Sequence, residues 1–250
     1  MSRPRVGLFA TCLVDLFRPQ TGLAAAELLE RAGCEVVVPK AQTCCGQPAW
    51  NSGDRATTRA LALALIDAFA DVDAVVAPSG SCIGMLRQFP DVLGATDPRQ
   101  GDAEALAAKS FELFEYLVDE RGYRPEPLAD PPTVTYHDSC AGLRECGIKG
   151  QPRALMAAAG VELKEMDAAE VCCGFGGTFC VKYPDISAAM TDAKVASIER
   201  SGAPLVTGGD LGCLLNIVGR LTRDERTVQA RHLAEVLVGD EGPPLGEGAS

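Results

Sequence analysis

The sequence predicts an α/β protein made of two tandem units, each with a small parallel sheet and flanking helices, related by a pseudo-twofold axis. The string Cys-Cys-Gly occurs twice, at 44–46 and 172–174. A single cysteine precedes each pair, and the spans from Cys12 to Cys44 and from Cys140 to Cys172 are both 32 positions. Short apolar stretches alternate with segments of helical apolar spacing, an order typical of parallel sheets.

The same series of elements is expected in both halves. A short apolar strand runs towards the first cysteine, a helix follows with apolar residues every four positions, and a β-branched strand leads to the Cys-Cys-Gly turn. A longer helix and a third apolar strand then lead to the last cysteine. The expected ranges are 6–10, 23–32, 35–38, 55–70 and 74–77 in the first half, and 134–136, 153–159, 162–166, 186–201 and 205–207 in the second.

Composition divides the chain at its proline-rich stretch. We expect a first unit at 1–123, a linker at 124–132 with the sequence RPEPLADPP, and a second unit at 133–238. The segment QARHLAEVL at 229–237 is interpreted as helical, with His232 in a structural role. The tail at 239–250 is rich in glycine and proline, which predicts disorder.

Charge and hydropathy exclude several classes of function. The formal net charge of −11 argues against nucleic acid and anionic membrane surfaces as partners. No apolar run reaches the roughly 18 residues of a membrane span, and the apolar stretch near the start is too short for a signal peptide. We therefore expect a cytoplasmic protein. In a reducing compartment its 11 cysteines favour metal or redox chemistry over disulfides.

Four cysteines per half are candidate metal ligands, because each stands just after an expected strand, where open α/β sheets place their ligands. Two adjacent thiols fit poorly as corners of one small ion's tetrahedron and fit better around a cluster of several metal atoms. Iron–sulfur ligation is therefore favoured, with a zinc site or metal-free reactive thiols as alternatives. The two sets are Cys12, Cys44, Cys45 and Cys82, and Cys140, Cys172, Cys173 and Cys213.

Other cysteines and one histidine need separate interpretation. Cys34, Cys146 and Cys180 have no counterpart in the other half, so we expect packing or loop roles for them. His137 stands three positions before Cys140, a spacing typical of a ligand. A histidine at a strand end also often forms only hydrogen bonds, so His137 is a candidate additional ligand or proton-transfer group.

Four stretches carry a resemblance to a known family: VGLFATCLVDLFRP at 6–19, VVAPSGSCIGM at 75–85, CCGFGGTF at 172–179 and TGGDLGCLLNIVGRL at 207–221. Together they resemble the cysteine-rich CCG-domain proteins, which include the cysteine-rich component of heterodisulfide reductase and the iron–sulfur component of glycolate oxidase. The arrangement is most similar to the lactate utilization protein A family. The resemblance implies electron transfer in L-lactate oxidation to pyruvate, with an iron–sulfur partner similar to lactate utilization protein B and a third, small partner similar to lactate utilization protein C.

The chain departs from the family motif at one position in each half. The motif of the family ends in Cys-x-x-Cys, whereas this chain has Ser79 and Asp210 at the first of those positions. A fifth thiolate is therefore missing, which favours one conventional [4Fe–4S] cluster per half, with zinc in one site as an alternative. Asp210 is a candidate additional ligand, although a helix-capping role is favoured for it and for Ser79.

No residue of the chain is predicted to be catalytic. The favoured function is an iron–sulfur electron-transfer component of an oxidoreductase. A cluster-based thiol or disulfide reductase subunit and a zinc-stabilised, non-redox interaction subunit are the alternatives.

Overall fold

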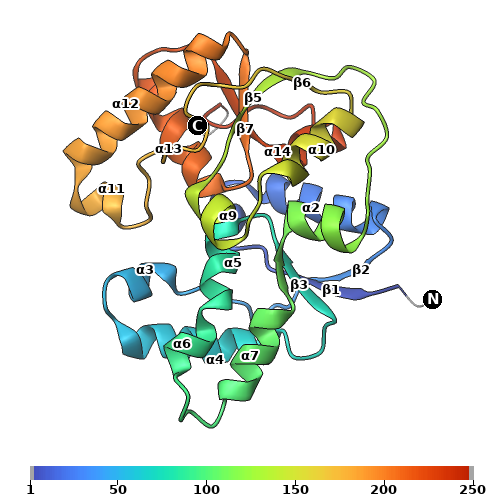
Figure 1. Ribbon diagram of the computed structural model, residues 1–250, viewed down its shortest axis with the longest axis vertical. Coiled ribbons are helices and arrows are strands. Elements are labelled where there is room, and N and C mark those ends of the chain that lie inside the picture. The colour runs from blue at the N-terminus through green and yellow to red at the C-terminus, as the bar shows by residue number, and fades with distance from the viewer. Residues whose placement is uncertain (1–2, 248–250) are drawn as a thin grey trace.

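Two four-stranded parallel sheets form the framework of the computed structural model, which describes residues 3–247 (Figure 1). The strand order is β2-β1-β3-β4 in the first sheet and β6-β5-β7-β8 in the second. Every strand pairing within the two sheets is parallel. The two halves thus share one topology, which confirms the predicted tandem α/β class.

The first half contains the elements β1 (Arg5–Leu8), α1 (Cys12–Phe17), α2 (Pro19–Arg31), β2 (Glu35–Val37), α3 (Gln47–Asn51), α4 (Arg55–Ala68), β3 (Ala74–Ala77), α5 (Gly80–Arg87), α6 (Phe89–Leu93), α7 (Gln100–Ala108), β4 (Ser110–Glu112), α8 (Leu113–Glu115) and a π-helical turn, η1 (Tyr116–Glu120). The second half contains β5 (Thr133–His137), α9 (Cys140–Glu145), α10 (Gly150–Ala158), β6 (Glu162–Leu163), α11 (Phe179–Lys182), α12 (Pro184–Ser201), β7 (Leu205–Gly208), α13 (Leu211–Arg223), β8 (Gln229–His232) and α14 (Leu233–Val238).

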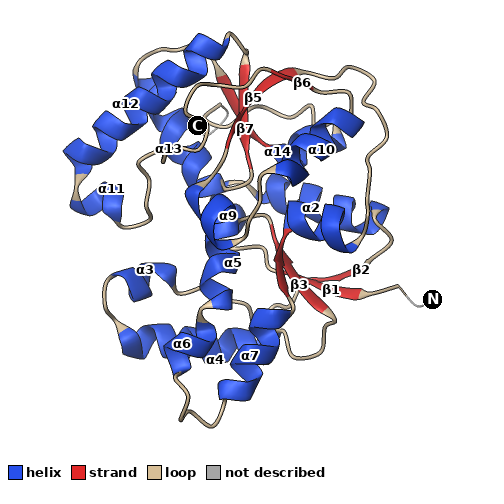
Figure 2. Ribbon diagram, in the orientation of Figure 1, coloured by secondary structure: helices blue, strands red, loops and turns tan. Residues whose placement is uncertain are grey.

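Helices cover both faces of each sheet. In the second half, α12 and α13 lie on one side of β5 and β7, and α10 and α14 lie on the other (Figure 2). The central strands β3 and β7 are buried along their whole length, as expected for parallel strands that are covered on both faces. This arrangement leaves the carboxyl ends of the strands as the edge where polar and sulfur-bearing side chains gather.

One edge strand in each sheet differs from the sequence-based expectation. Strand β4 was not expected, and the segment QARHLAEVL, expected to be one helix, is instead the strand β8 followed by the short helix α14. Residues of β8 alternate between more exposed and buried, which is strand periodicity within a segment too short to show it clearly. His232 is the N-cap of α14, where its Nδ1 accepts a hydrogen bond from Ala234 N at 3.2 Å.

The two halves share a hydrophobic core. Helix α2 of the first half packs on α14 of the second, and one cluster of buried side chains includes Leu28 and Phe114 together with Tyr136 and Leu233. Helices α5 and α9 also meet closely, since a Cβ on Gly80 would lie 2.7 Å from the Gly142 Cα. The segment 124–132 joins the halves without helix or strand. Because the core is shared, the expected boundaries of the units at 123 and 133 stay a prediction.

Part of the tail, whose composition predicts disorder, makes defined contacts. Residues 239–247 are described and pack against the second half. Leu245 is buried and its N–H donates to the Ala230 carbonyl at 2.8 Å, while the Pro243 carbonyl accepts from the Arg18 guanidinium at 2.7 Å. Arg231 also donates to the Asp240 carbonyl at 3.1 Å and to the Gly242 carbonyl. The disorder expected for 239–250 stays a prediction, and residues 248–250 lie outside the described part.

Within residues 3–247, every helix is too short or too polar to cross a lipid bilayer.

Candidate metal centres

The eight cysteines expected to be ligands all lie at the carboxyl ends of strands. In the first half, Cys12 begins α1 just after β1, Cys44 and Cys45 stand in the loop after β2, and Cys82 lies in the first turn of α5 after β3. Parallel strands bring these three loops to one edge of the sheet. The second half repeats this placement with Cys140, Cys172, Cys173 and Cys213.

The structure brings the four thiols of each half together in the same pattern. In the first half the Cys12 and Cys44 Sγ atoms are 3.9 Å apart, and Cys45 lies close enough to Cys44 and Cys82 for these thiols to raise its pKa. In the second half the Cys173 and Cys213 Sγ atoms lie within 4.8 Å of each other, and Cys172 raises the pKa of both Cys140 and Cys173. Each half therefore holds a chain of four neighbouring thiols, although their role as ligands stays a prediction.

The glycine after each cysteine pair makes the turn that places both thiols on one site. Gly46 and Gly174 have φ angles of 89° and 91°, a conformation that other residues rarely adopt. The N–H of Gly46 donates to Cys44 Sγ at 3.5 Å, and that of Gly174 donates to Cys172 Sγ at 3.4 Å. The turn therefore also aims a backbone donor at sulfur in each half.

Neighbouring thiols in each half have pKa values shifted in opposite directions. Hydrogen bonds from Cys12 and Cys45 lower the pKa of Cys44 to about 2, and those from Cys140 and Cys173 lower the pKa of Cys172 to about 2. The same hydrogen bonds, with burial, raise the pKa of Cys12 and of Cys140. A metal bound by these cysteines would displace the protons of their thiols.

The three cysteines outside the repeat lie outside both thiol groups. Cys34 is fully buried in the core shared by the halves. The thiol of Cys146 contacts the Gly80 carbonyl at 3.6 Å, and that of Cys180 contacts the Gly177 carbonyl at 3.2 Å. These contacts agree with the packing and loop roles expected for them.

His137 faces the second group of thiols. Its side chain is 1% exposed, and neither ring nitrogen has a hydrogen-bond partner among the described residues. One ring nitrogen lies with the Cys173 and Cys213 Sγ atoms in a group whose donor atoms are all within 4.8 Å of one another. Burial, followed by the nearby Lys194 ammonium, lowers the pKa of His137 to about 3, so the imidazole is neutral. An unpartnered neutral imidazole at this place fits a metal or cluster.

Asp210 and Ser79 cap helices. Asp210 Oδ1 accepts from Gly212 N at 3.1 Å, and Oδ2 accepts from Ser81 N at 3.1 Å and from Ser79 Oγ at 3.2 Å. Ser79 Oγ accepts from Cys82 N at 3.4 Å. Both carboxylate oxygens are therefore occupied, which agrees with the capping role favoured for Asp210.

Each thiol group borders a cavity that could hold a cofactor. The cavity beside Cys12 and Cys44 has a volume of about 410 Å³. The cavity beside Cys140, Cys172 and Cys213 has a volume of about 130 Å³, and Gln47 of the first half contributes to its wall. Four converging thiols, backbone donors directed at sulfur and adjacent space are together the features that a sulfur-ligated metal or cluster requires.

Sequence reasoning missed three polar residues beside the second thiol group: Lys194, Thr191 and Asn216. Lys194 is 2% exposed, and Thr191 Oγ1 and Asn216 Nδ2 donate to the Cys173 carbonyl at 2.9 and 3.1 Å. Each lies inside an amphipathic helix, where a single polar residue carries no separate pattern. A position-by-position comparison of the two halves would have found them.

Comparison with known proteins agrees with this repeated geometry. The family model of the cysteine-rich domain named CCG matches twice, at residues 6–87 and 134–218. The lactate utilization protein A of Geobacillus kaustophilus is 45% identical over 93% of this chain and 98% of that protein, and the one of Bacillus subtilis is 43% identical over 93% and 98%.

A solved structure shows the same fold at low sequence similarity. The crystal structure of a hypothetical protein from Helicobacter pylori matches with a TM-score of 0.63 at 12% identity, covering 97% of this chain and 51% of that one. With two matches to one domain family, and relatives aligned along nearly their whole length, the chain belongs to the lactate utilization protein A family of cysteine-rich CCG-domain proteins.

Proposed function

We propose that this chain is the iron–sulfur electron-transfer component of a system that oxidises L-lactate to pyruvate. Each half would hold one cluster, of the [4Fe–4S] type, on its four thiols. The names of the relatives supply the lactate role. The observation that carries the electron-transfer role is the recurrence of one four-thiol chain at the strand ends of both halves.

The residues of the chain would bind and insulate the clusters. An iron–sulfur cluster, when bound, takes up and releases single electrons with little change in geometry. The cysteines would anchor it, and the N–H groups of Gly46 and Gly174 already point at sulfur, where they would stabilise negative charge. Cys45 and Cys173 are buried, so one side of each site is closed to water.

Lactate oxidation needs a hydride or two-electron acceptor, and this sequence contains no flavin or dinucleotide fingerprint. The proposal therefore includes partners: an iron–sulfur protein similar to lactate utilization protein B, and a third component similar to lactate utilization protein C. The complex would work in the cytoplasm.

The test is strictly anaerobic purification, followed by analysis of iron, acid-labile sulfide and zinc and by redox titration. We expect about eight irons per chain, from two four-iron clusters, and a reversible one-electron signal from each half. A strain that depends on this protein should lose growth on L-lactate when the cysteines of either half are replaced by serine. Stoichiometric zinc and no redox signal after anaerobic isolation would contradict the proposal.

A second candidate, a zinc ion in the second half, is favoured by one observation. His137, Cys173 and Cys213 form a group of nitrogen and sulfur donors, and mixed Cys and His ligation is common for zinc. Zinc in the second half and iron in the first, measured in the same anaerobic preparation, would select this candidate.

A further inference from the structure

The surroundings of the two thiol groups differ, although their folds are equivalent. Helix α4 and the residue after it bury Thr58, Ala62, Leu65, Ile66 and Phe69. Helix α12 buries Ser197 and, at positions equivalent to those five, Ser187, Thr191, Lys194, Val195 and Ile198. The spacing within the two sets is identical. Lys194 therefore occupies the place that Leu65 has in the first half.

At three other equivalent positions an apolar residue in the first half corresponds to a polar residue in the second. Phe9 and His137 each stand three residues before the first cysteine, and both are buried. Thr191 of α12 stands at the position equivalent to Ala62 of α4. Met85 and Asn216 each stand three residues after the last cysteine. The first thiol group thus has apolar neighbours where the second has a cation, an imidazole, a hydroxyl and an amide.

Lys194 is a buried cation with no carboxylate partner. Its Nζ donates to the Ala168 and Ala169 carbonyls at 2.7 and 3.2 Å. Arg18 is the other buried Lys or Arg in residues 3–247, and it pairs with Glu235. An ammonium has three N–H donors, so one donor of Lys194 is not used by these carbonyls. The charged groups that Lys194 faces are Asp138 and the thiols of the second group.

Two carboxylates, Asp138 and Asp210, also act on the second site. Asp138 forms a two-point ion pair with Arg153, with both N–O distances 2.9 Å. Asp210 lines the cavity of the second site and raises the pKa of Cys140 and Cys213, and it accepts three hydrogen bonds, from Ser79, Ser81 and Gly212, which partly screen its charge. Lys194 is thus the buried cation of the second site, whereas the cation that lines the cavity of the first site, Lys40, is exposed.

We propose that Lys194, with His137 and Asn216, makes the group held by the second half easier to reduce than the group held by the first. The inference rests on the proposed cluster-binding function. A buried positive charge stabilises the electron-rich state, and polar N–H groups beside the site, such as the Asn216 amide that donates to the Cys173 carbonyl, act in the same direction. Apolar neighbours such as Phe9 and Leu65 give no such stabilisation.

The redox step is a transfer of one electron. The group in the first half is oxidised by one electron and the group in the second half is reduced by one. All thiolates stay bound, and no proton needs to move. In the experiment the electron comes from an added chemical reductant. The group in the second half would therefore hold the transferred electron before it leaves the chain.

The test is a potentiometric titration of the anaerobically reconstituted full chain, followed by electron paramagnetic resonance. A Cys140→Ser variant assigns the second-half signal by removing it. We expect that signal to have the higher midpoint potential in the wild-type protein. Lys194→Met should lower this potential and leave that of the first half unchanged. Leu65→Met, at the equivalent position, is the matched control and should move neither potential away from wild type.

Lys194 also holds the loop at Ala168 and Ala169, so its replacement could reduce cluster loading. Asn216→Met, which introduces the residue found at the equivalent position of the first half, then distinguishes an electrostatic role from a structural one. It should lower the midpoint potential of the second half by a smaller shift. A purely structural role predicts lower stability of Lys194→Met with an unchanged potential, and this result overturns the inference. Equal potentials in both halves of the loaded wild-type protein overturn the inference alone, whereas a chain that binds no redox-active cluster overturns it together with the proposed function.

Discussion

Ser79 and Asp210 form an isolated antiparallel bridge between the two halves, and Ser79 Oγ donates to Asp210 Oδ2 at 3.2 Å. Each residue stands three positions before the last cysteine of its half. Equivalent residues can pair in antiparallel fashion only where a pseudo-twofold axis passes between them. In the full motif of the family this position is a fifth cysteine. In this chain the side chains at this position, Ser79 and Asp210, join the two halves and cap helices α5 and α13.

Removing the Asp210 carboxylate should strongly destabilise the protein. Asp210→Ala leaves Ser79 Oγ, Ser81 N and Gly212 N without their buried acceptor. We expect a loss of about 3 kcal/mol in the free energy of unfolding, measured by urea denaturation of the metal-free chain. Asp130→Ala, at an exposed carboxylate, is the control and should change it by less than about 0.5 kcal/mol. Equal stability of the two variants would show that the bridge contributes little.

Replacing one cysteine of the second group should remove one cluster and leave the other. Cys173 follows Cys172 in the sequence and its Sγ lies within 4.8 Å of the Cys213 Sγ, so Cys173→Ser removes a member of the thiol group. We expect about half of the iron and sulfide to be lost, together with the second redox signal. Cys180→Ser is the matched control, because the Cys180 thiol contacts the Gly177 carbonyl and not the thiol group. Loss of iron in the control as well would count against the assigned ligand set.

The buried ion pair between Arg18 and Glu235 should be essential for holding the halves together. Arg18 Nη2 lies 2.7 Å from Glu235 Oε2, and both side chains are largely shielded from water. Glu235→Ala leaves an unpaired buried cation, so we expect a loss of about 3–5 kcal/mol in the free energy of unfolding. Glu27→Ala, which breaks the exposed Arg31–Glu27 pair, should cost at most about 0.5 kcal/mol. Chemical denaturation followed by circular dichroism measures both, and similar losses would refute this expectation.

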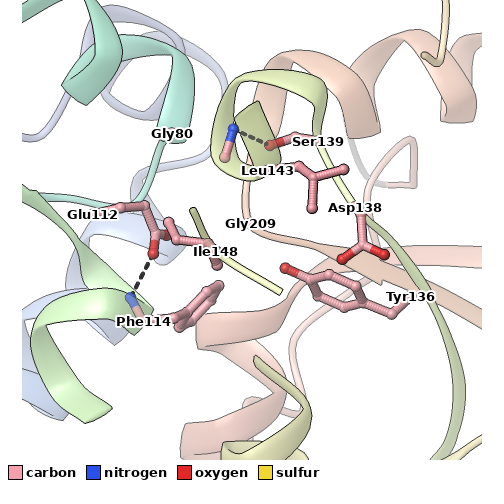
Figure 3. Close-up of a pocket in the computed structure, with 10 residues that line it drawn as sticks. Gly80, Glu112, Phe114, Tyr136, Asp138, Ser139, Leu143, Ile148 and Gly209 are labelled. Carbon is pink, nitrogen blue, oxygen red and sulfur yellow. Dashed lines mark hydrogen bonds between the residues drawn. The ribbon is translucent and has the colours of Figure 1, made fainter. Parts of the chain in front are cut away.

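Glu112 should make stability fall as the pH rises. It lies between the halves beside a cavity of about 10 Å³, room for about one water molecule, and the Tyr136 hydroxyl points towards it (Figure 3). Glu112 Oε2 accepts from Phe114 N at 2.7 Å, whereas Oε1 has no hydrogen-bond partner among the described residues. Burial, with smaller contributions from the Glu115 and Asp210 carboxylates, raises the pKa of Glu112 from 4.5 to about 8.

The direction in which Glu112 changes stability with pH follows from the number of protons that each state binds. Between pH 4.5 and about 8 the folded state holds the Glu112 proton and the unfolded state does not, so the folded state binds more protons there. Stability from this group is full below pH 4.5 and is lost as the pH rises to about 8, by on the order of a few kcal/mol. Glu112→Gln should flatten this part of the profile, measured as the urea midpoint against pH. An unchanged slope in the variant would mean that another group carries the pH dependence.

The halves and their thiol groups were predictable because they leave local and repeated signals in the sequence. Cys-Cys-Gly, the equal 32-residue spans and the apolar strands before each cysteine all act over short distances along the chain. The positive φ angles of Gly46 and Gly174 confirm the tight turns that this string predicts. The edge strand β8 was missed because its four residues are too few to separate strand from helix periodicity.

By itself, the sequence determined the tandem α/β class and the family, and it predicted the two sets of four cysteines, because a duplicated motif preserves spacing and local turn chemistry. Only the tertiary structure decided what depends on residues distant in the chain. It paired Ser79 with Asp210 across the halves, placed the unpartnered His137 beside Cys173 and Cys213, and buried Lys194 where the other half has Leu65. Burial and electrostatics depend on which neighbours exclude water from a charge, and packing of the two halves chooses those neighbours.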